Sequence, residues 1–138
     1  MKKFILSAGL VLCTSSIAIA SYTNYFDQYG TKQNSYNTSG NTTYEYNSYG
    51  QKTGTYQRSG NTTYSYDEYG AKTGSYHTNG STTTQYNQYG QKVGTFKTNG
   101  DTTTSYDKYG AKTGSYKKNR DGSTTQYNKY GQKVGTFK

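Results

Sequence analysis

Aromatic side chains recur every ten residues through the middle of the sequence, where they could build either a core or a binding surface. They stand at Tyr66, Tyr76, Tyr86, Phe96, Tyr106 and Tyr116. Rings at a fixed spacing can pack on one another and stabilise a fold, and exposed tyrosines can stack on sugar rings. We therefore expect these six residues to form a structural ladder, and rows of exposed tyrosine to offer a glycan-binding surface.

Basic side chains are the second group that could bind a ligand. Beyond Lys2 and Lys3 the sequence has fourteen basic and seven acidic residues, and ten of these basic residues but only three acidic ones lie between Ser81 and Lys138. The candidate polymer-binding residues are Lys97, Lys108, Lys117, Lys118, Arg120 and Lys129. Clustered positive charge attracts anionic polymers, and salt screens that attraction. The sequence therefore predicts salt-sensitive binding to an anionic cell-surface polysaccharide or cell wall.

Residues for catalysis or metal binding form no recognisable pattern. His77 is the single histidine, and the equivalent positions of other repeats hold other polar residues. Asp67 and Glu68 are adjacent in a predicted turn, where we expect both to be exposed. The sequence has no histidine pair, calcium loop, phosphate loop or Ser-His-Asp set. We therefore predict that the protein is not an enzyme and has no catalytic residue, metal site or cofactor.

A tandem repeat arranges all of these residues. Tyr-Gly pairs end at Gly30, Gly50, Gly70, Gly90, Gly110 and Gly131. Their spacing is twenty residues in four steps and twenty-one in the last. Residues 21–138 thus form a single array of six Tyr/Gly/Thr-rich repeats, in which each unit buries surface only against its neighbours.

Two turn signals alternate about ten residues apart within each repeat. One is Asp/Asn-x-Tyr-Gly, as at Asp67 to Gly70, and the other is Asn-Gly or Ser-Gly, as at Asn79-Gly80. The segments between them are rich in Thr and Tyr and have the length of short strands. The sequence predicts an all-β fold, an antiparallel β-hairpin meander with about two strands per repeat. A β-solenoid is the alternative, but it would stack the repeat lysines at the ~4.8 Å strand spacing, so charge repulsion favours the meander.

Alternation along the strands predicts which side chains share a face. We expect one face of the sheet to be aromatic and the other to carry hydroxyl groups. One glycine per repeat falls within a strand on the aromatic face, at Gly54, Gly74, Gly94, Gly114 and Gly135. Asn34 takes this slot in the first repeat. Because Asn tolerates a left-handed backbone better than most residues, we expect a bulge or a positive φ there.

Residues 1–20 have the layout of a secretory signal peptide. Lys2 and Lys3 precede an apolar run that ends at Cys13, and Ala20 ends a stretch of small residues. The run is too short for a permanent transmembrane helix. We predict cleavage before Ser21, a mature chain without a transmembrane segment, and export to the periplasm, the cell surface or the medium.

The repeat core resembles a known family. Tyr64-Ser65-Tyr66-Asp67-Glu68-Tyr69-Gly70 and the copy at Tyr106-Asp107-Lys108-Tyr109-Gly110 are similar to the YD repeats of bacterial Rhs-type surface proteins. The run Tyr-Gly-Gln-Lys-Val-Gly-Thr-Phe that begins at Tyr89 resembles MORN-type repeats, which is the weaker alternative. Both resemblances imply antiparallel β-hairpins.

Two functions fit these features. The first is a secreted or cell-surface structural or adhesive protein, because the edge strands of an open sheet can pair with other chains and promote self-association. The alternative is a glycan- or cell-wall-binding module that uses exposed tyrosine rows and the basic C-terminal half. We expect no dedicated nucleic-acid partner for an exported protein of this kind.

Overall fold

The computed structural model describes residues 21–138, so the predicted signal peptide at residues 1–20 lies outside the described part. Residues 21–138 form twelve antiparallel strands joined by short turns. The strands are β1 (Ser21–Asp27), β2 (Lys32–Ser39), β3 (Thr42–Asn47), β4 (Lys52–Ser59), β5 (Thr62–Asp67), β6 (Lys72–Asn79), β7 (Thr82–Asn87), β8 (Lys92–Asn99), β9 (Thr102–Asp107), β10 (Lys112–Lys118), β11 (Thr124–Asn128) and β12 (Lys133–Phe137). The predicted hairpin meander is confirmed.

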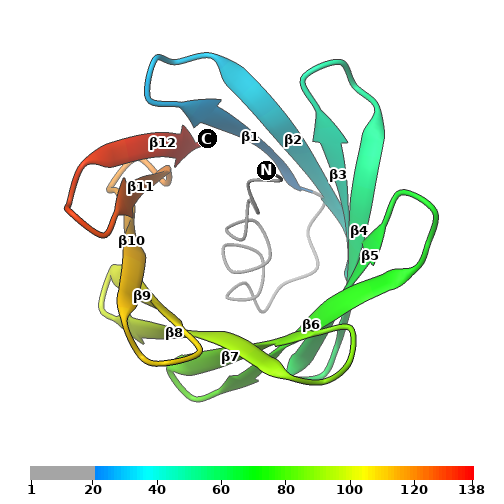
Figure 1. The fold of residues 1–138 in the computed structure, drawn as a ribbon. Helices are drawn as coiled ribbons and strands as arrows, with labels where there is room; N and C mark the ends of the chain where they lie inside the picture. Colours follow the sequence, from blue (N-terminus) through cyan, green and yellow to red (C-terminus); the bar gives the residue numbers. More distant parts are fainter. Residues whose placement is uncertain (1–20) are drawn as a thin grey trace.

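The meander closes into a barrel, in which each described strand pairs with a neighbour on both sides (Figure 1). The closing pair joins β1 to β12, with Tyr25 opposite Phe137. Backbone hydrogen bonds between Asn24 and Lys138 extend this pairing, at 2.6 Å and 2.8 Å between nitrogen and oxygen. The solenoid alternative is therefore wrong. Closure also removes the open sheet edges, through which an adhesive protein was expected to self-associate.

Aromatic rings fill the inner face of the barrel. The buried cluster consists of Tyr25, Tyr36, Tyr76, Phe96, Tyr116 and Phe137, with Tyr56 packed against it. These residues come from seven strands spread around the barrel, so only its inner side can bring them together. Tyr36 and Phe96 are 1% and 2% exposed. A tyrosine ring packs like an apolar group while its hydroxyl needs a hydrogen-bond partner, so this core has no need of the aliphatic residues that the repeats lack.

The prediction of one aromatic face and one hydroxyl face is wrong, because each face alternates rings with small polar groups. On the inner face Ser65 lies opposite Tyr56, and on the outer face Thr55 lies opposite Tyr66. Side chains on paired residues point to the same side of a sheet. Consecutive strands of a repeat therefore place their rings on opposite faces.

The predicted ladder of six rings is divided in the same way. Tyr76, Phe96 and Tyr116 belong to the buried inner cluster. Tyr66, Tyr86 and Tyr106 lie on the outer face, each directly opposite a serine or threonine of the preceding strand. The six residues therefore form two rows on opposite sides of the barrel wall.

The repeated strand glycine is needed for close packing of two backbones. A Cβ on Gly94 would lie 2.8 Å from the carbonyl oxygen of Tyr106 on the next strand, and the same crowding recurs at Gly74 and Gly114. The predicted bulge is present, since Thr53 is an extra residue between Lys52 and Gly54 where the facing strand has none. The other alternative, a positive φ, is absent from these strand glycines and from Asn34.

Candidate functional site

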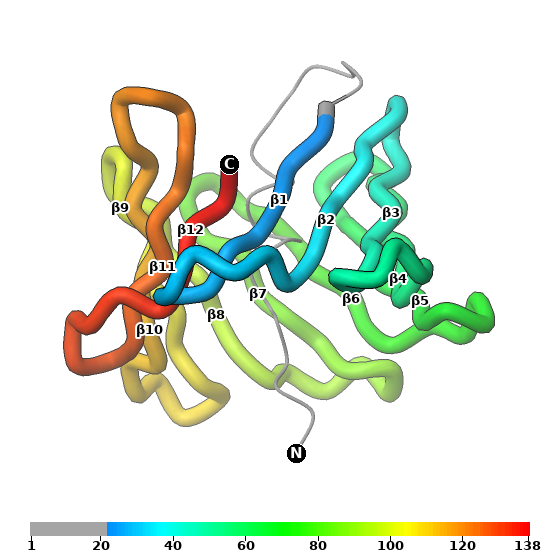
Figure 2. Tube along the Cα trace, turned by 90° about the horizontal axis from the view of Figure 1, so that it is seen from above, coloured from blue at the N-terminus to red at the C-terminus, as the bar shows by residue number. Residues whose placement is uncertain are grey.

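Six tyrosines stand at the tips of turns at one end of the barrel and form the most exposed aromatic group among the described residues. We call them the tyrosine rim: Tyr29, Tyr49, Tyr69, Tyr89, Tyr109 and Tyr130. Their exposed fractions lie between 76% and 88%. The strands alternate in direction, so every turn of this kind falls at the same end, and Figure 2 shows hairpin turns at both ends of the barrel.

Each rim tyrosine is held by a turn with the same hydrogen bonds. In the first turn a carboxylate oxygen of Asp27 accepts from the backbone N–H groups of Tyr29 and Thr31, both at 2.9 Å. The N–H of Gly30 donates to the Asp27 carbonyl at 3.0 Å, and Gly30 has a φ of 82°. The other five turns repeat this arrangement, with Asn or Asp in the capping position. The rim therefore presents its rings on fixed backbones.

The choice between Asp and Asn in these turns follows the residue four positions later. Asn47 donates its side-chain N–H to the side-chain oxygen of Gln51 at 2.9 Å, and the two other Asn turns contain the same pair. The turns capped by Asp67 and Asp107 have alanine at this place. Asp and Asn both provide the side-chain oxygen that accepts the backbone hydrogen bonds of the turn. The side-chain N–H of Asn in addition donates a hydrogen bond to Gln.

In the sequence the Tyr-Gly pairs mark the repeats, and the rim was not among the predicted sites. The turn requires the capping oxygen and the glycine, whereas the exposed ring between them bonds to neither. A large aromatic residue in six of six turns is therefore unexplained by folding. That mismatch is the sequence signal by which the rim could have been found.

Charge around the rim differs from turn to turn. The ammonium group of Lys108 lies 5.0 Å from the ring centre of Tyr109, and that of Lys129 lies 5.1 Å from Tyr130. These contacts leave the rings exposed and place positive charge beside them. The turn of Tyr69 has an acidic residue, Glu68, in place of these lysines. A hydrogen bond from Tyr69 to Glu68 raises the pKa of the Tyr69 phenol. The rim is thus basic on the side formed by β9 to β12.

The structure does not bring the six predicted polymer-binding residues into one patch. Lys108 and Lys129 lie in rim turns, while Lys118 and Arg120 lie near the loop between β10 and β11, at the other end of the barrel. Lys97 and Lys117 lie on the outer wall, in equivalent positions of β8 and β10. Lys97 also stacks over the Tyr106 ring at 5.5 Å. Only Lys108 and Lys129 are placed to act together with the tyrosine rim.

The carboxylate of Glu45 lies on the inner face, and the equivalent residues of the other repeats are neutral. Glu45 accepts hydrogen bonds from Tyr56 at 3.1 Å and from Asn34 at 3.0 Å, with a longer contact to Tyr36 at 3.5 Å. Burial raises the pKa of Glu45 above its ordinary value, although these hydrogen bonds oppose the shift. Glu45 was not among the predicted site residues, because alternation along one strand does not show which face lies inside the barrel.

The raised pKa of Glu45 predicts a pH-dependent stability. Glu45 binds its proton more tightly in the folded protein than in the unfolded chain. The stabilisation by protonated Glu45 is therefore complete below the pKa that Glu45 has in the unfolded chain. It is lost as the pH rises through the folded pKa. The melting temperature should therefore fall from about pH 4 towards neutrality.

The matched variant is Glu45→Gln, because Gln85 and Gln126 occupy the equivalent positions. Its melting temperature at neutral pH should be higher than that of the wild type, and its fall with pH should be smaller. Thermal unfolding across this range measures both. Parallel curves for the two proteins would show that Glu45 is not responsible.

Residues 21–138 were also searched for catalytic residues, metal ligands and membrane-spanning helices. His77 lies on the outer face and makes a 3.0 Å hydrogen bond with Thr62. Within this range no group of three or more His, Cys, Asp and Glu side chains could hold a metal ion. The same residues contain no helix that is long and apolar enough to cross a membrane.

Comparison with known proteins adds no family assignment. No protein-family model matches the chain, and no curated protein matches it. The resemblance to YD repeats therefore stays a prediction. What the structure defines is a closed antiparallel β-barrel built from six hairpin repeats.

Proposed function

We propose that the protein is a non-enzymatic, exported binding module that attaches to glycan or cell-wall polymers through the tyrosine rim. The observation that carries this proposal is the set of six turn tyrosines, each at least 76% exposed and each held by the same capped turn. Large exposed aromatic surfaces on a folded protein mark interaction sites. Here the exposure is repeated in every copy, which favours a ligand that is itself repetitive.

Sugar polymers suit such a surface better than compact ligands do. The apolar face of a sugar ring packs on a tyrosine ring, while the phenol group hydrogen-bonds to hydroxyls. Equivalent strands lie two strand spacings apart, so adjacent rim tyrosines are separated by about 10 Å or more. That separation is comparable with the length of a disaccharide unit. Several weak contacts along one polymer chain would then combine into firm attachment.

The basic side of the rim favours polymers that carry negative charge. Lys108 and Lys129 place ammonium groups next to the rings of Tyr109 and Tyr130. Charge attraction accelerates encounter and weakens with salt, whereas stacking on the rings does not depend on salt in the same way. We propose that a neutral part and an anionic part of the ligand contact the two sides of the rim.

A structural or adhesive role is the second candidate, and the same rim favours it. Because closure pairs every described strand on both sides, self-association would have to occur between exposed surfaces. Two rims could stack their tyrosines on each other and join barrels end to end. The protein would then build a matrix without any strand exchange.

Sedimentation separates the two candidates. The purified protein is centrifuged alone and with an insoluble cell-wall polysaccharide, at low and moderate salt. A binding module stays in solution alone and sediments with the polysaccharide, in part even at moderate salt because the rings remain in contact. Sedimentation of the protein by itself would favour the structural role, and no sedimentation in either case would contradict both.

A further inference from the structure

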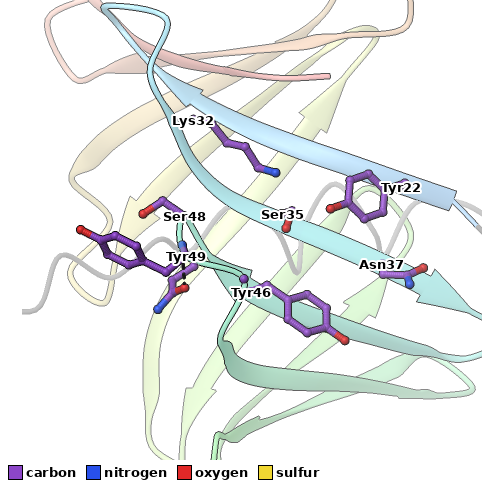
Figure 3. Close-up of a pocket in the computed structure, with 9 residues that line it drawn as sticks. Tyr22, Lys32, Ser35, Asn37, Tyr46, Ser48 and Tyr49 are labelled. Carbon is purple, nitrogen blue, oxygen red and sulfur yellow. Dashed lines mark hydrogen bonds between the residues drawn. The ribbon is translucent and has the colours of Figure 1, made fainter.

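A groove on the outer wall of the barrel crosses β1, β2 and β3 and ends against the turn that carries Tyr49 (Figure 3). Its volume is about 470 Å³. We call it the outer groove; its lining residues that matter here are Tyr22, Lys32, Ser35, Asn37 and Tyr46. Ser35 lies in the middle strand, directly opposite Tyr46, and is nearly buried. The two tyrosines therefore stand on either side of a polar floor.

The outer groove contains a residue at which the first repeat differs from all the others. Tyr22 is replaced by threonine at the equivalent positions Thr42, Thr62, Thr82 and Thr102. Asn37, which pairs directly with Tyr22 across β1 and β2, is replaced by Gln57, His77, Lys97 and Lys117. Tyr22 is 60% exposed, so its ring is not required to fill the core. The position of Asn37 varies among all the repeats, so the ring of Tyr22 is the feature particular to the first repeat. An exposed ring at this one copy indicates a local function.

Lys32 is available to a ligand in a way that the matching lysines of the next two repeats are not. The ammonium groups of Lys52 and Lys72 lie 5.3 Å and 4.7 Å from the ring centres of Tyr44 and Tyr64. In the first repeat the position of those rings is held by Asn24, so Lys32 has no such ring beside it. Figure 3 shows its side chain extending along the groove in the direction of Tyr22.

These groups together match one kind of ligand. Two tyrosine rings offer stacking surface for a sugar ring, and the Asn37 amide and Ser35 hydroxyl can bond to sugar hydroxyls. Among the lining residues within 21–138, Lys32 supplies the formal charge. The nearby carboxylate of Asp27 is already occupied by Tyr29, Thr31 and Gln33. Among residues 21–138 no ring stacks under the Lys32 ammonium group, yet Lys32 shares one groove with two tyrosines and a polar floor. Such a groove is complementary to a sugar that carries a carboxylate.

We propose that the outer groove binds a single hexuronic acid residue of an acidic polysaccharide, with its carboxylate on Lys32 and its ring against Tyr22. This site shares only Tyr49 with the tyrosine rim, and its ligand can be a short oligosaccharide. It would add to the preference for acidic glycans that the basic side of the rim provides.

Calorimetric titration of the purified protein with galacturonic acid and glucuronic acid trisaccharides tests the proposal. The neutral trisaccharides obtained by reducing the carboxyl groups serve as the reference ligands. The wild type should bind at least one acidic trisaccharide more tightly than its neutral partner. Equal affinity for the two, or no measurable binding of either acid, would overturn the proposal.

Two variants test whether the ligand binds in the outer groove. Tyr22→Thr introduces the residue that four other repeats use, so the fold should tolerate it, and loss of the ring contact should weaken binding about tenfold. Lys32→Gln should reduce the affinity for the acidic ligand to that for the neutral one. Lys72→Gln, the matched change two repeats along the wall, should leave binding unchanged. Unaltered binding by Tyr22→Thr, or an equal loss in Lys72→Gln, would contradict the assignment.

The proposed role of the rim and the proposed site in the groove can be tested separately. A variant with serine at the rim positions other than Tyr49 should still bind the acidic trisaccharide with wild-type affinity. If that variant loses trisaccharide binding, the short ligand binds at the rim and the groove assignment is wrong. If the rim variant still sediments with an uncharged polymer while the groove variants behave as expected, only the proposed role of the rim is contradicted.

Discussion

Replacing Phe96 by alanine should lower the free energy of unfolding by about 3–5 kcal/mol. Phe96 is 2% exposed and belongs to the buried cluster to which seven strands contribute. Removing its ring takes apolar contacts from several strands at once, and the closed wall limits how far the neighbours can move to fill the space. Chemical denaturation followed by circular dichroism measures the loss.

Two controls accompany this variant. Phe96→Tyr introduces the residue found at the equivalent positions Tyr36, Tyr56, Tyr76 and Tyr116, so it should stay close to the wild type. Tyr89→Ala removes a ring of similar size that is 78% exposed, and it should change the stability by no more than about 0.5 kcal/mol. A small loss for Phe96→Ala, or a large one for Tyr89→Ala, would mean that the inner and outer assignments are reversed.

Changing all six rim tyrosines to serine should abolish sedimentation with an uncharged cell-wall polysaccharide while the protein stays folded. Each ring contributes a weak contact, and the contacts act together because one polymer chain meets several of them. Losing such multivalent attachment should reduce the apparent affinity by about 10²-fold to 10⁴-fold. The capped turns remain intact, since their hydrogen bonds use backbone N–H groups and the Asp or Asn side chains.

The matched variant changes the outer-wall tyrosines Tyr66, Tyr86 and Tyr106 to serine instead. These residues are partly buried against the wall. Some loss of stability is expected from them, but polymer binding by the folded fraction should persist. If the outer-wall variant loses binding and the rim variant keeps it, the binding surface is the side of the barrel and the rim has another role.

The sequence was sufficient to predict the strands, because the two turn signals leave little freedom between them. Asp67 to Gly70 and Asn79-Gly80 enclose β6, which begins at Lys72 and ends at Asn79. Antiparallel pairing followed from turns of two to five residues. Repetition then gave the same hairpin six times, which is the meander that the structure shows.

The distribution of side chains between the two faces could not be predicted from alternation alone. The bulge at Thr73 places Lys72 opposite Tyr66, while Gly74 lies opposite Ser65. Lys72 therefore lies on the outer face although simple alternation groups it with Gly74. One extra residue in a strand is enough to move a side chain to the other face.

Closure depends on contacts that no local pattern contains. Tyr25 lies opposite Phe137, and the two rings are 4.6 Å apart between centres, although more than one hundred residues separate them in sequence. Each local signal is equally compatible with an open sheet. Because the exposed rim and the outer groove are defined only once inner and outer faces exist, they too required the structure.

The most direct test of the account is a titration observed at the tyrosine rings. Protein with isotope-labelled tyrosine is studied by nuclear magnetic resonance while soluble fragments of cell-wall polysaccharide are added, and the signals are assigned by single Tyr→Phe variants. We predict that the signals of the rim tyrosines shift or broaden, while those of the buried Tyr36, Tyr76 and Tyr116 stay unchanged. Binding that leaves every rim signal in place would contradict the account.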